Sequence, residues 1–115
     1  MFPPEFIKGI QEFNDQKFFE CHETLESLWN TQTGLARLLT QGIIQIAVGY
    51  YHATKGNLPG AGKLFTAGLN KVRKAESQYQ NIDMRSFTQQ VEGDLLKVTN
   101  HHEINQYPMI RFVQE

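Results

Sequence analysis

Residues 18 to 29 read F-F-E-C-H-E-T-L-E-S-L-W, and this stretch decides the fold. At about 3.6 residues per turn, most of its apolar side chains fall on one face and most of its polar side chains on the other, which predicts an amphipathic helix. His22 and Glu26 are exceptions, because they lie one turn apart within the apolar arc, between Phe18 on one side and Phe19 on the other. A buried ionisable group is costly unless it is paired or hydrogen-bonded. We therefore expect both side chains to point into the core and to have partners there.

The remaining chain predicts helices and no strand, because apolar residues recur at spacings of three and four and no alternating run appears. Gly56 and Asn57 form a good helix stop and restart, while Asp15 and Asp83 are suited to cap the helices that follow them. The expected helices cover residues 3 to 13, 18 to 29, 35 to 55, 59 to 78 and about 84 to 100. The prediction is an all-α, compact bundle of about five helices, with an extended C-terminal tail packed on it.

Length and charge restrict the class of protein. The 115 residues fit a single domain, residues 1 to 115, with one hydrophobic core. A formal net charge of -1, from 11 basic and 12 acidic residues, provides no electrostatic footprint for nucleic acid. No apolar run is long enough to span a membrane, the first residues lack the pattern of a signal peptide, and Cys21 has no partner for an internal disulfide. We expect a cytoplasmic protein without nucleic-acid or membrane partners.

The predicted helix over residues 35 to 55 is apolar almost all round, as is typical of a helix buried by its neighbours. Its polar exceptions, Gln41, Gln45 and His52, share one narrow stripe, and Gly42 and Gly49 lie beside it. Glycine within a helix costs about 0.5 to 1 kcal/mol relative to alanine, so two of them suggest a closely approaching backbone. Consecutive helices joined by a short loop are neighbours, so we expect this backbone to belong to the helix over residues 18 to 29.

These expectations place His22 and Glu26 opposite Gln41, Gln45 and His52, in a polar seam between two helices. One interpretation is a satisfied hydrogen-bond network that fixes the register of the pair. The other is a pocket for a small ligand or metal, whose mouth Glu23 could reach. The spacing matches neither H-E-x-x-H nor E-x-x-H, so we predict no metal and no cofactor. Cys21 is expected to be a small core thiol.

The sequence resembles the uncharacterised bacterial, archaeal and plastid family called domain of unknown function 309. Its pattern of F-N, F-F-E-x-H-E-x-L-E-x-x-W, Q-G-x-I-Q and G-N-x-x-G-A is matched over roughly residues 5 to 75, although Asp15 and Gln16 stand where the turn often has glycine. The pattern falls on Glu20, His22, Glu23, Glu26, Trp29, Gln41, Gln45, His52 and Asn57. The resemblance implies a compact all-helical domain and supplies no activity.

We predict a non-enzymatic binding or interaction module with a small ligand or a protein as its unidentified partner, and homodimerisation through an exposed aromatic or apolar patch stays open. The alternative is a small hydrolase-like or metal-binding enzyme. In that version His22 or His52 acts as general base or metal ligand, Glu26 orients it, and the glutamine amides position a polar substrate.

Overall fold

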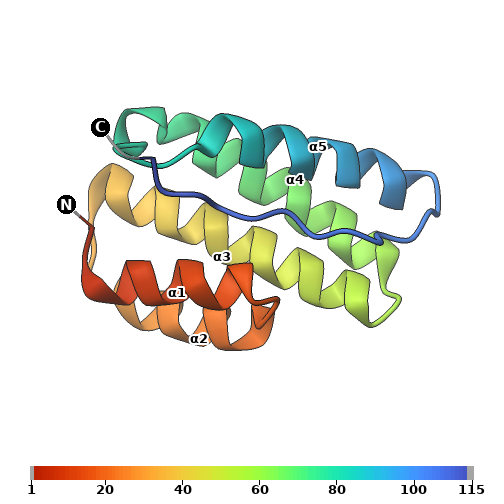
Figure 1. Ribbon diagram of the computed structural model, residues 1–115, viewed down its shortest axis with the longest axis horizontal. Coiled ribbons are helices and arrows are strands. Elements are labelled where there is room, and N and C mark those ends of the chain that lie inside the picture. The colour runs from red at the N-terminus through yellow and green to blue at the C-terminus, as the bar shows by residue number, and fades with distance from the viewer. Residues whose placement is uncertain (1, 114–115) are drawn as a thin grey trace.

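Five α-helices and one short 3-10 helix form the fold, seen in a computed structural model that describes residues 2–113 (Figure 1). The elements are α1 (Pro4–Asn14), α2 (Phe18–Trp29), α3 (Gly34–Thr54), α4 (Leu58–Lys74), η1 (Glu76–Gln78) and α5 (Met84–Thr99). Residues 100 to 113 follow as a largely extended tail that runs back along the helices. The predicted all-α class and the packed tail are confirmed.

Three of the helix boundaries follow from local chemistry that the sequence predicts. Gly56 adopts a φ of 77°, in the left-handed region that glycine tolerates, and ends the turn after α3. Asn57 then caps α4, because its side-chain oxygen accepts a hydrogen bond of 3.0 Å from the Gly60 amide. In the same way Asp83 caps α5 by accepting from the Ser86 amide at 3.1 Å.

One predicted cap and one predicted helix boundary are wrong. The helix α2 begins after Lys17, with no side-chain cap, because Gln16 takes a positive φ of 62° in the turn and places Asp15 too early to reach the first helical amides. The helix α4 ends at Lys74 instead of residue 78, and the chain tightens into the 3-10 turn η1. The hydroxyl of Tyr79 donates a hydrogen bond to the Val72 carbonyl, which folds this turn back onto the end of α4.

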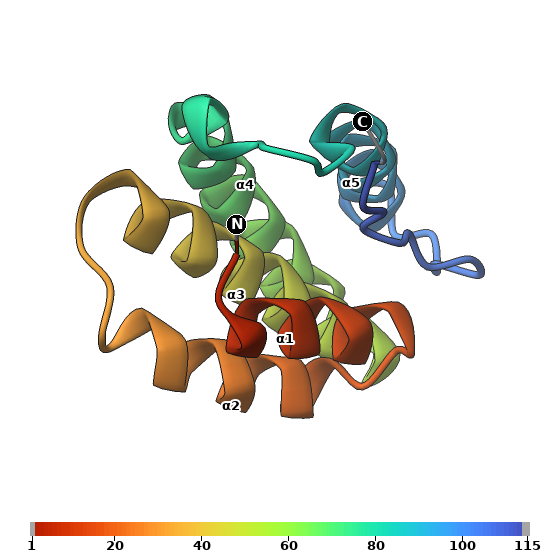
Figure 2. The ribbon, with the colours of Figure 1, turned by 60° about the vertical axis from the view of Figure 1, so that its left-hand side comes forward.

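The helices are arranged in two layers. Consecutive helices pack as neighbours, so α2, α3 and α4 lie side by side with α3 in the middle. The helix α1 packs on α2 and α5 packs on α4, and the tail runs between α1 and α5 on the same side of α3 (Figures 1 and 2). The helix α3 is therefore flanked on two sides and covered on a third, while its fourth side faces away from the tail. We call that side of the α2–α3–α4 layer the outer face.

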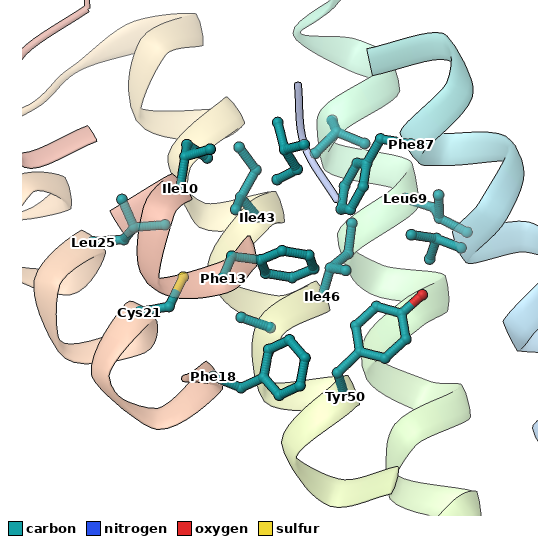
Figure 3. Close-up of a cluster of buried hydrophobic side chains, with 14 of the residues drawn as sticks. Ile10, Phe13, Phe18, Cys21, Leu25, Ile43, Ile46, Tyr50, Leu69 and Phe87 are labelled. Carbon is teal, nitrogen blue, oxygen red and sulfur yellow. The ribbon is translucent and has the colours of Figure 1, made fainter. Parts of the chain in front are cut away.

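The hydrophobic core lies between the two layers. The rings of Phe13 and Phe18 meet edge to face with centroids 5.2 Å apart, and Phe18 stacks on Tyr50 at 5.6 Å. Phe13 also meets Phe87 of α5 at 5.4 Å, and Tyr50 meets Phe65 of α4 at 4.6 Å, so aromatic contacts join all five helices. Figure 3 shows these rings together with the aliphatic side chains of α1, α2 and α3 that surround them.

The tail is held on the core by its backbone as well as by its side chains. The Asn14 side chain at the end of α1 donates to the Ile110 carbonyl and accepts from the Ile110 amide, both at 2.8 Å. Near the end of the described chain, Ile82 and Phe112 form an isolated antiparallel bridge. Ile104, Pro108 and Ile110 are buried. The tail thus provides one wall of the core.

The close approach predicted from Gly42 and Gly49 exists, but its partner is α4 and not α2. A Cβ atom on Gly42 would lie 2.9 Å from the Gly68 carbonyl oxygen, and one on Gly68 would lie 2.7 Å from the Gly42 carbonyl oxygen. Gly49 likewise faces the Phe65 ring at 2.7 Å. The reason is that α4 has its own small residue at the crossing, which lets the two backbones approach on that side of α3.

Candidate functional site

The sequence-predicted site lies on the α2–α3 pair. These helices are antiparallel and joined by residues 30 to 33, so the start of α2 lies beside the end of α3. The rings of Phe19 and Tyr51 mark this junction, with centroids 5.9 Å apart. Phe19 is 50% exposed, and it also lies 6.1 Å from the His22 ring. A residue expected to complete the apolar arc of α2 is therefore at the surface.

His22 and Glu26 contact each other, but they are not in the core. Nε2 of His22 lies 2.9 Å from Oε2 of Glu26, and the two side chains are 31% and 53% exposed. The buried arc of α2 is formed by Phe18, Cys21, Leu25 and Leu28. Because Phe19 is outside this arc, the pair occupies its edge and is partly exposed to solvent, so only a small desolvation cost has to be offset. An exposed pair of this spacing contributes about 0.3 to 0.5 kcal/mol.

The polar residues of α3 form a second group on the outer face. Gln41, Gln45 and His52 are each half-buried, and Leu38 and Val48 continue the same line of side chains. Successive residues turn by about 100° around a helix, which sets this line opposite the core residues Ile43 and Tyr50. We call these five residues the outer stripe: Leu38, Gln41, Gln45, Val48 and His52.

The two groups do not form the hydrogen-bonded seam that the sequence predicts. Within residues 2–113, no hydrogen bond joins His22 or Glu26 to Gln41, Gln45 or His52. Nδ1 of His52 lies 3.4 Å from Nδ2 of Asn57, and Oε1 of Gln45 is buried without a partner. Ring contacts through Phe19 and Tyr51 connect the groups instead.

The structure also shows where Glu23 lies and whether the predicted site residues line a pocket or group as metal ligands. Glu23 is exposed on α2. Five of the cavities in the described chain measure 160 to 550 Å³, and none of the six predicted site residues lines any of these five. In residues 2–113 no three His, Cys, Asp or Glu side chains are grouped as metal ligands would be. The arrangement favours a contact surface over an enclosed pocket.

A buried polar pair that sequence reasoning missed lies between α3 and α5. The Tyr50 hydroxyl donates to Oδ2 of Asp94 at 2.6 Å, and Asp94 is only 5% exposed. Burial raises the pKa of Asp94 above its usual range, although the Tyr50 hydrogen bond and the Lys97 ammonium oppose this shift. Burial also raises the pKa of Tyr50, reinforced by the neighbouring carboxylate. The sequence contains a signal for this pair, because position 94 continues the three- and four-residue spacing of Phe87, Val91 and Val98 but is an aspartate.

Cys21 is the core thiol that the sequence predicts, with no exposed surface. Burial, reinforced by the Glu12 carboxylate, raises the pKa of Cys21 to about 12, so the thiolate is almost absent at neutral pH. We expect Cys21 in the native protein to react with a disulfide reagent at least about 100-fold more slowly than in urea-unfolded protein. Stopped-flow measurement of thiol release in both states checks this, and similar rates would show that α2 opens readily.

None of the helices in residues 2–113 combines the length and the apolar character needed to cross a bilayer. The fold and the site thus define a small all-α protein with a half-buried polar and apolar stripe on its central helix.

Residues 6–64 match the model of a family described as domain of unknown function (DUF309). The matched segment is more than half of the 115 residues, and the chain belongs to this family. The chain is also 32% identical over 85 residues to the uncharacterized protein YpuF of Bacillus subtilis (strain 168), an alignment covering 72% of this chain and 47% of that protein. The chain thus spans about half the length of that relative. The resemblance expected from the sequence motifs is confirmed, and the outer stripe falls within the matched residues.

Proposed function

We infer that the protein is a non-enzymatic interaction module that binds another protein through the outer stripe of α3. The observation that carries this proposal is the composition of α3. Of its 21 residues only Arg37 is an Asp, Glu, Lys or Arg, although one side of the helix is not covered by the rest of the chain. A helix with one side in water normally has charged residues there, whereas a helix without them is normally covered on all sides.

The arrangement of the stripe supports the same conclusion. Its five residues follow one another at spacings of three, four, three and four, which is the pattern of a helix that packs against another helix. Along the stripe, apolar Leu38 and Val48 stand among amide and imidazole groups, and the exposed Phe19 ring extends the stripe toward α2. Aromatic side chains such as Phe19 are enriched at the centres of protein interfaces, where charged residues are depleted.

Photo-crosslinking tests this proposal in cells of the organism that produces the chain. We expect p-benzoylphenylalanine in place of Val48 to form discrete covalent adducts with protein, because this side chain lies within the stripe, next to its central residue Gln45. The same group in place of Gln89, which is exposed on α5, serves as the matched control. Adducts at position 48 should decrease when Gln41 is also replaced by glutamate. Equal labelling at positions 48 and 89, or labelling unaffected by the second change, would contradict the proposal.

Hydrolysis is the second candidate function, and the observation that favours it is the 2.9 Å contact between His22 and Glu26. A carboxylate that holds an imidazole in this way orients a general base. The pair is exposed and lines none of the five cavities, so a substrate would have to be enclosed by something else. Hydrolysis of activated esters that is lost in both His22→Gln and Glu26→Gln variants would support this candidate, whereas equal rates in all three proteins would remove it.

A further inference from the structure

We propose that a cavity between α5 and the tail binds a small α-amino acid, whose ammonium group contacts Asp94 and whose carboxylate contacts Lys97. The cavity measures 240 Å³, and it is lined by Gly93, Asp94 and Lys97 from α5 and by residues 106 to 108 from the tail. The tail passes α5 on the side of α3 that is opposite the outer face (Figure 1). This site is therefore separate from the outer stripe and goes beyond the interaction module proposed above.

Asp94 supplies a carboxylate oxygen that the protein leaves without a hydrogen bond. Asp94 is only 5% exposed, and its Oδ2 accepts from the Tyr50 hydroxyl at 2.6 Å. Its other oxygen, Oδ1, accepts no hydrogen bond within residues 2–113, yet it is not sealed from solvent, and Asp94 lines the cavity. Most polar atoms in so buried a side chain are hydrogen-bonded. Oδ1 is therefore an acceptor that a donor inside the cavity can reach.

Lys97 places a positive charge beside this oxygen without bonding to it. Nζ of Lys97 lies 3.8 Å from Oδ1 of Asp94, which is beyond hydrogen-bond distance, and its side chain is 49% exposed. Lys97 and Asp94 are also the charged residues among those that line the cavity. The cavity thus presents one anionic acceptor and one cationic donor side by side, and their charges sum to zero.

These two charges restrict the class of ligand. A ligand with only an ammonium group would be repelled by Lys97, and a ligand with only a carboxylate would be repelled by Asp94. A molecule that has both groups is attracted by both residues and adds no net charge to a partly buried site. In an α-amino acid the two groups are attached to the same carbon atom. They are therefore close enough to contact two protein atoms that are only 3.8 Å apart.

The size and the remaining walls of the cavity are compatible with this class. A cavity of about 150 Å³ accepts benzene, so 240 Å³ holds about ten non-hydrogen atoms, of which the α-amino acid group uses about five. Gln90, Gln106 and Tyr107 also line the cavity, and their side chains both donate and accept hydrogen bonds. The Tyr107 ring packs on the Tyr50 ring at 5.8 Å, which holds the tail wall against the core. The walls thus suit a short polar side chain on the ligand.

Two-dimensional NMR of the purified, isotope-labelled chain tests this proposal. The probes are the common L-amino acids of up to about ten non-hydrogen atoms, each added separately. We expect at least one to bind with a dissociation constant of about 1 mM or below and to shift the amide signals of Gly93 and Gln106, which lie on two walls of the cavity. For the amino acid that binds best, the amine without its carboxylate and the acid without its ammonium should each bind at least about 10-fold more weakly.

Two substitutions remove the two charges separately. Asp94→Asn and Lys97→Met should each raise the dissociation constant of the best amino acid at least about 10-fold. The matched controls are Glu92→Gln and Lys74→Met, which remove the same charges from exposed positions outside the cavity and should leave the dissociation constant within about twofold. Circular dichroism checks that each variant folds. A misfolded Asp94→Asn protein is replaced by Gly93→Leu, which adds a large side chain to a wall of the cavity where a Cβ atom meets nothing within 4 Å.

Several results would overturn the proposal. They are the absence of binding by any of these amino acids below about 10 mM, equally tight binding of the amine or the acid, and unchanged affinity in the folded variants of the cavity. Binding that shifts neither Gly93 nor Gln106 would also overturn it. None of these measurements depends on crosslinking at position 48, so the cavity and the outer stripe are tested separately.

Discussion

Replacing Gly68 by alanine is expected to lower the free energy of unfolding by about 2 kcal/mol or more, because the new methyl group would overlap the backbone of α3. Its position would be 2.7 Å from the Gly42 carbonyl oxygen and 3.1 Å from the Ile46 amide nitrogen. These are backbone atoms of a central helix, so they can move only if α3 and α4 separate. Urea unfolding followed by circular dichroism measures the change.

Gly93 on α5 provides the matched control. It also lies within a helix, but a Cβ atom there would meet nothing within 4 Å. Gly93→Ala should therefore raise the free energy of unfolding by about 0.5 to 1 kcal/mol, through helix propensity alone. If Gly68→Ala and Gly93→Ala had the same effect, α3 and α4 would not be in the close contact described here.

Replacing Tyr50 by phenylalanine is expected to lower the free energy of unfolding by about 1.5 to 3 kcal/mol at neutral pH, because it leaves the buried Asp94 carboxylate without its hydrogen-bond donor. The loss should become smaller as the pH falls toward about 4. Burial raises the pKa of Asp94 in the folded state, and removing the Tyr50 hydroxyl raises it further. A carboxyl with a raised pKa contributes stability below its unfolded pKa and loses it as pH rises through the folded pKa. Urea unfolding across this pH range measures the difference.

Asp94→Asn separates the charge from the hydrogen bond. The asparagine carbonyl still accepts from Tyr50, and the buried charge is gone, so we expect stability within about 1 kcal/mol of the wild type at neutral pH. Tyr50→Phe should cost less in the Asp94→Asn background than in the wild type, and its cost should no longer depend on pH. A pH-independent loss in the Tyr50→Phe single variant would show that the carboxylate is not the group responsible.

The parts of the fold that depend on local chemistry could be predicted from the sequence. The bounds of α2 at Phe18 and Trp29 follow from its apolar periodicity, and the turn at Gly56 and Asn57 follows from a residue that accepts positive φ next to one that caps. Such features are decided within a few residues of chain, where sequence and structure are closely linked.

The parts of the fold that depend on which helix is adjacent could not be predicted from the sequence. Gly42 and Gly49 indicate that a backbone comes close but not whose backbone it is, and the answer depends on Gly68 in a later helix. The periodicity of α2 places Phe19 on the apolar arc and His22 within that arc. In the structure, half of Phe19 is exposed, so the arc is narrower and His22 lies at its edge. Periodicity assigns residues to faces, and the tertiary packing decides which faces are covered.

Packing of the C-terminal tail requires a contact between residues that are far apart in the sequence, which affects the order of folding. The Asn14 side chain bonds to the Ile110 backbone, a contact that spans 96 residues, whereas α2, α3 and α4 form from neighbours joined by short turns. Local contacts form first, because closing a long loop costs more chain entropy than closing a short one. We therefore expect the α2–α3–α4 layer to form first and the tail to pack on it in a late step. Contacts made in such a late step mainly determine how slowly the protein unfolds.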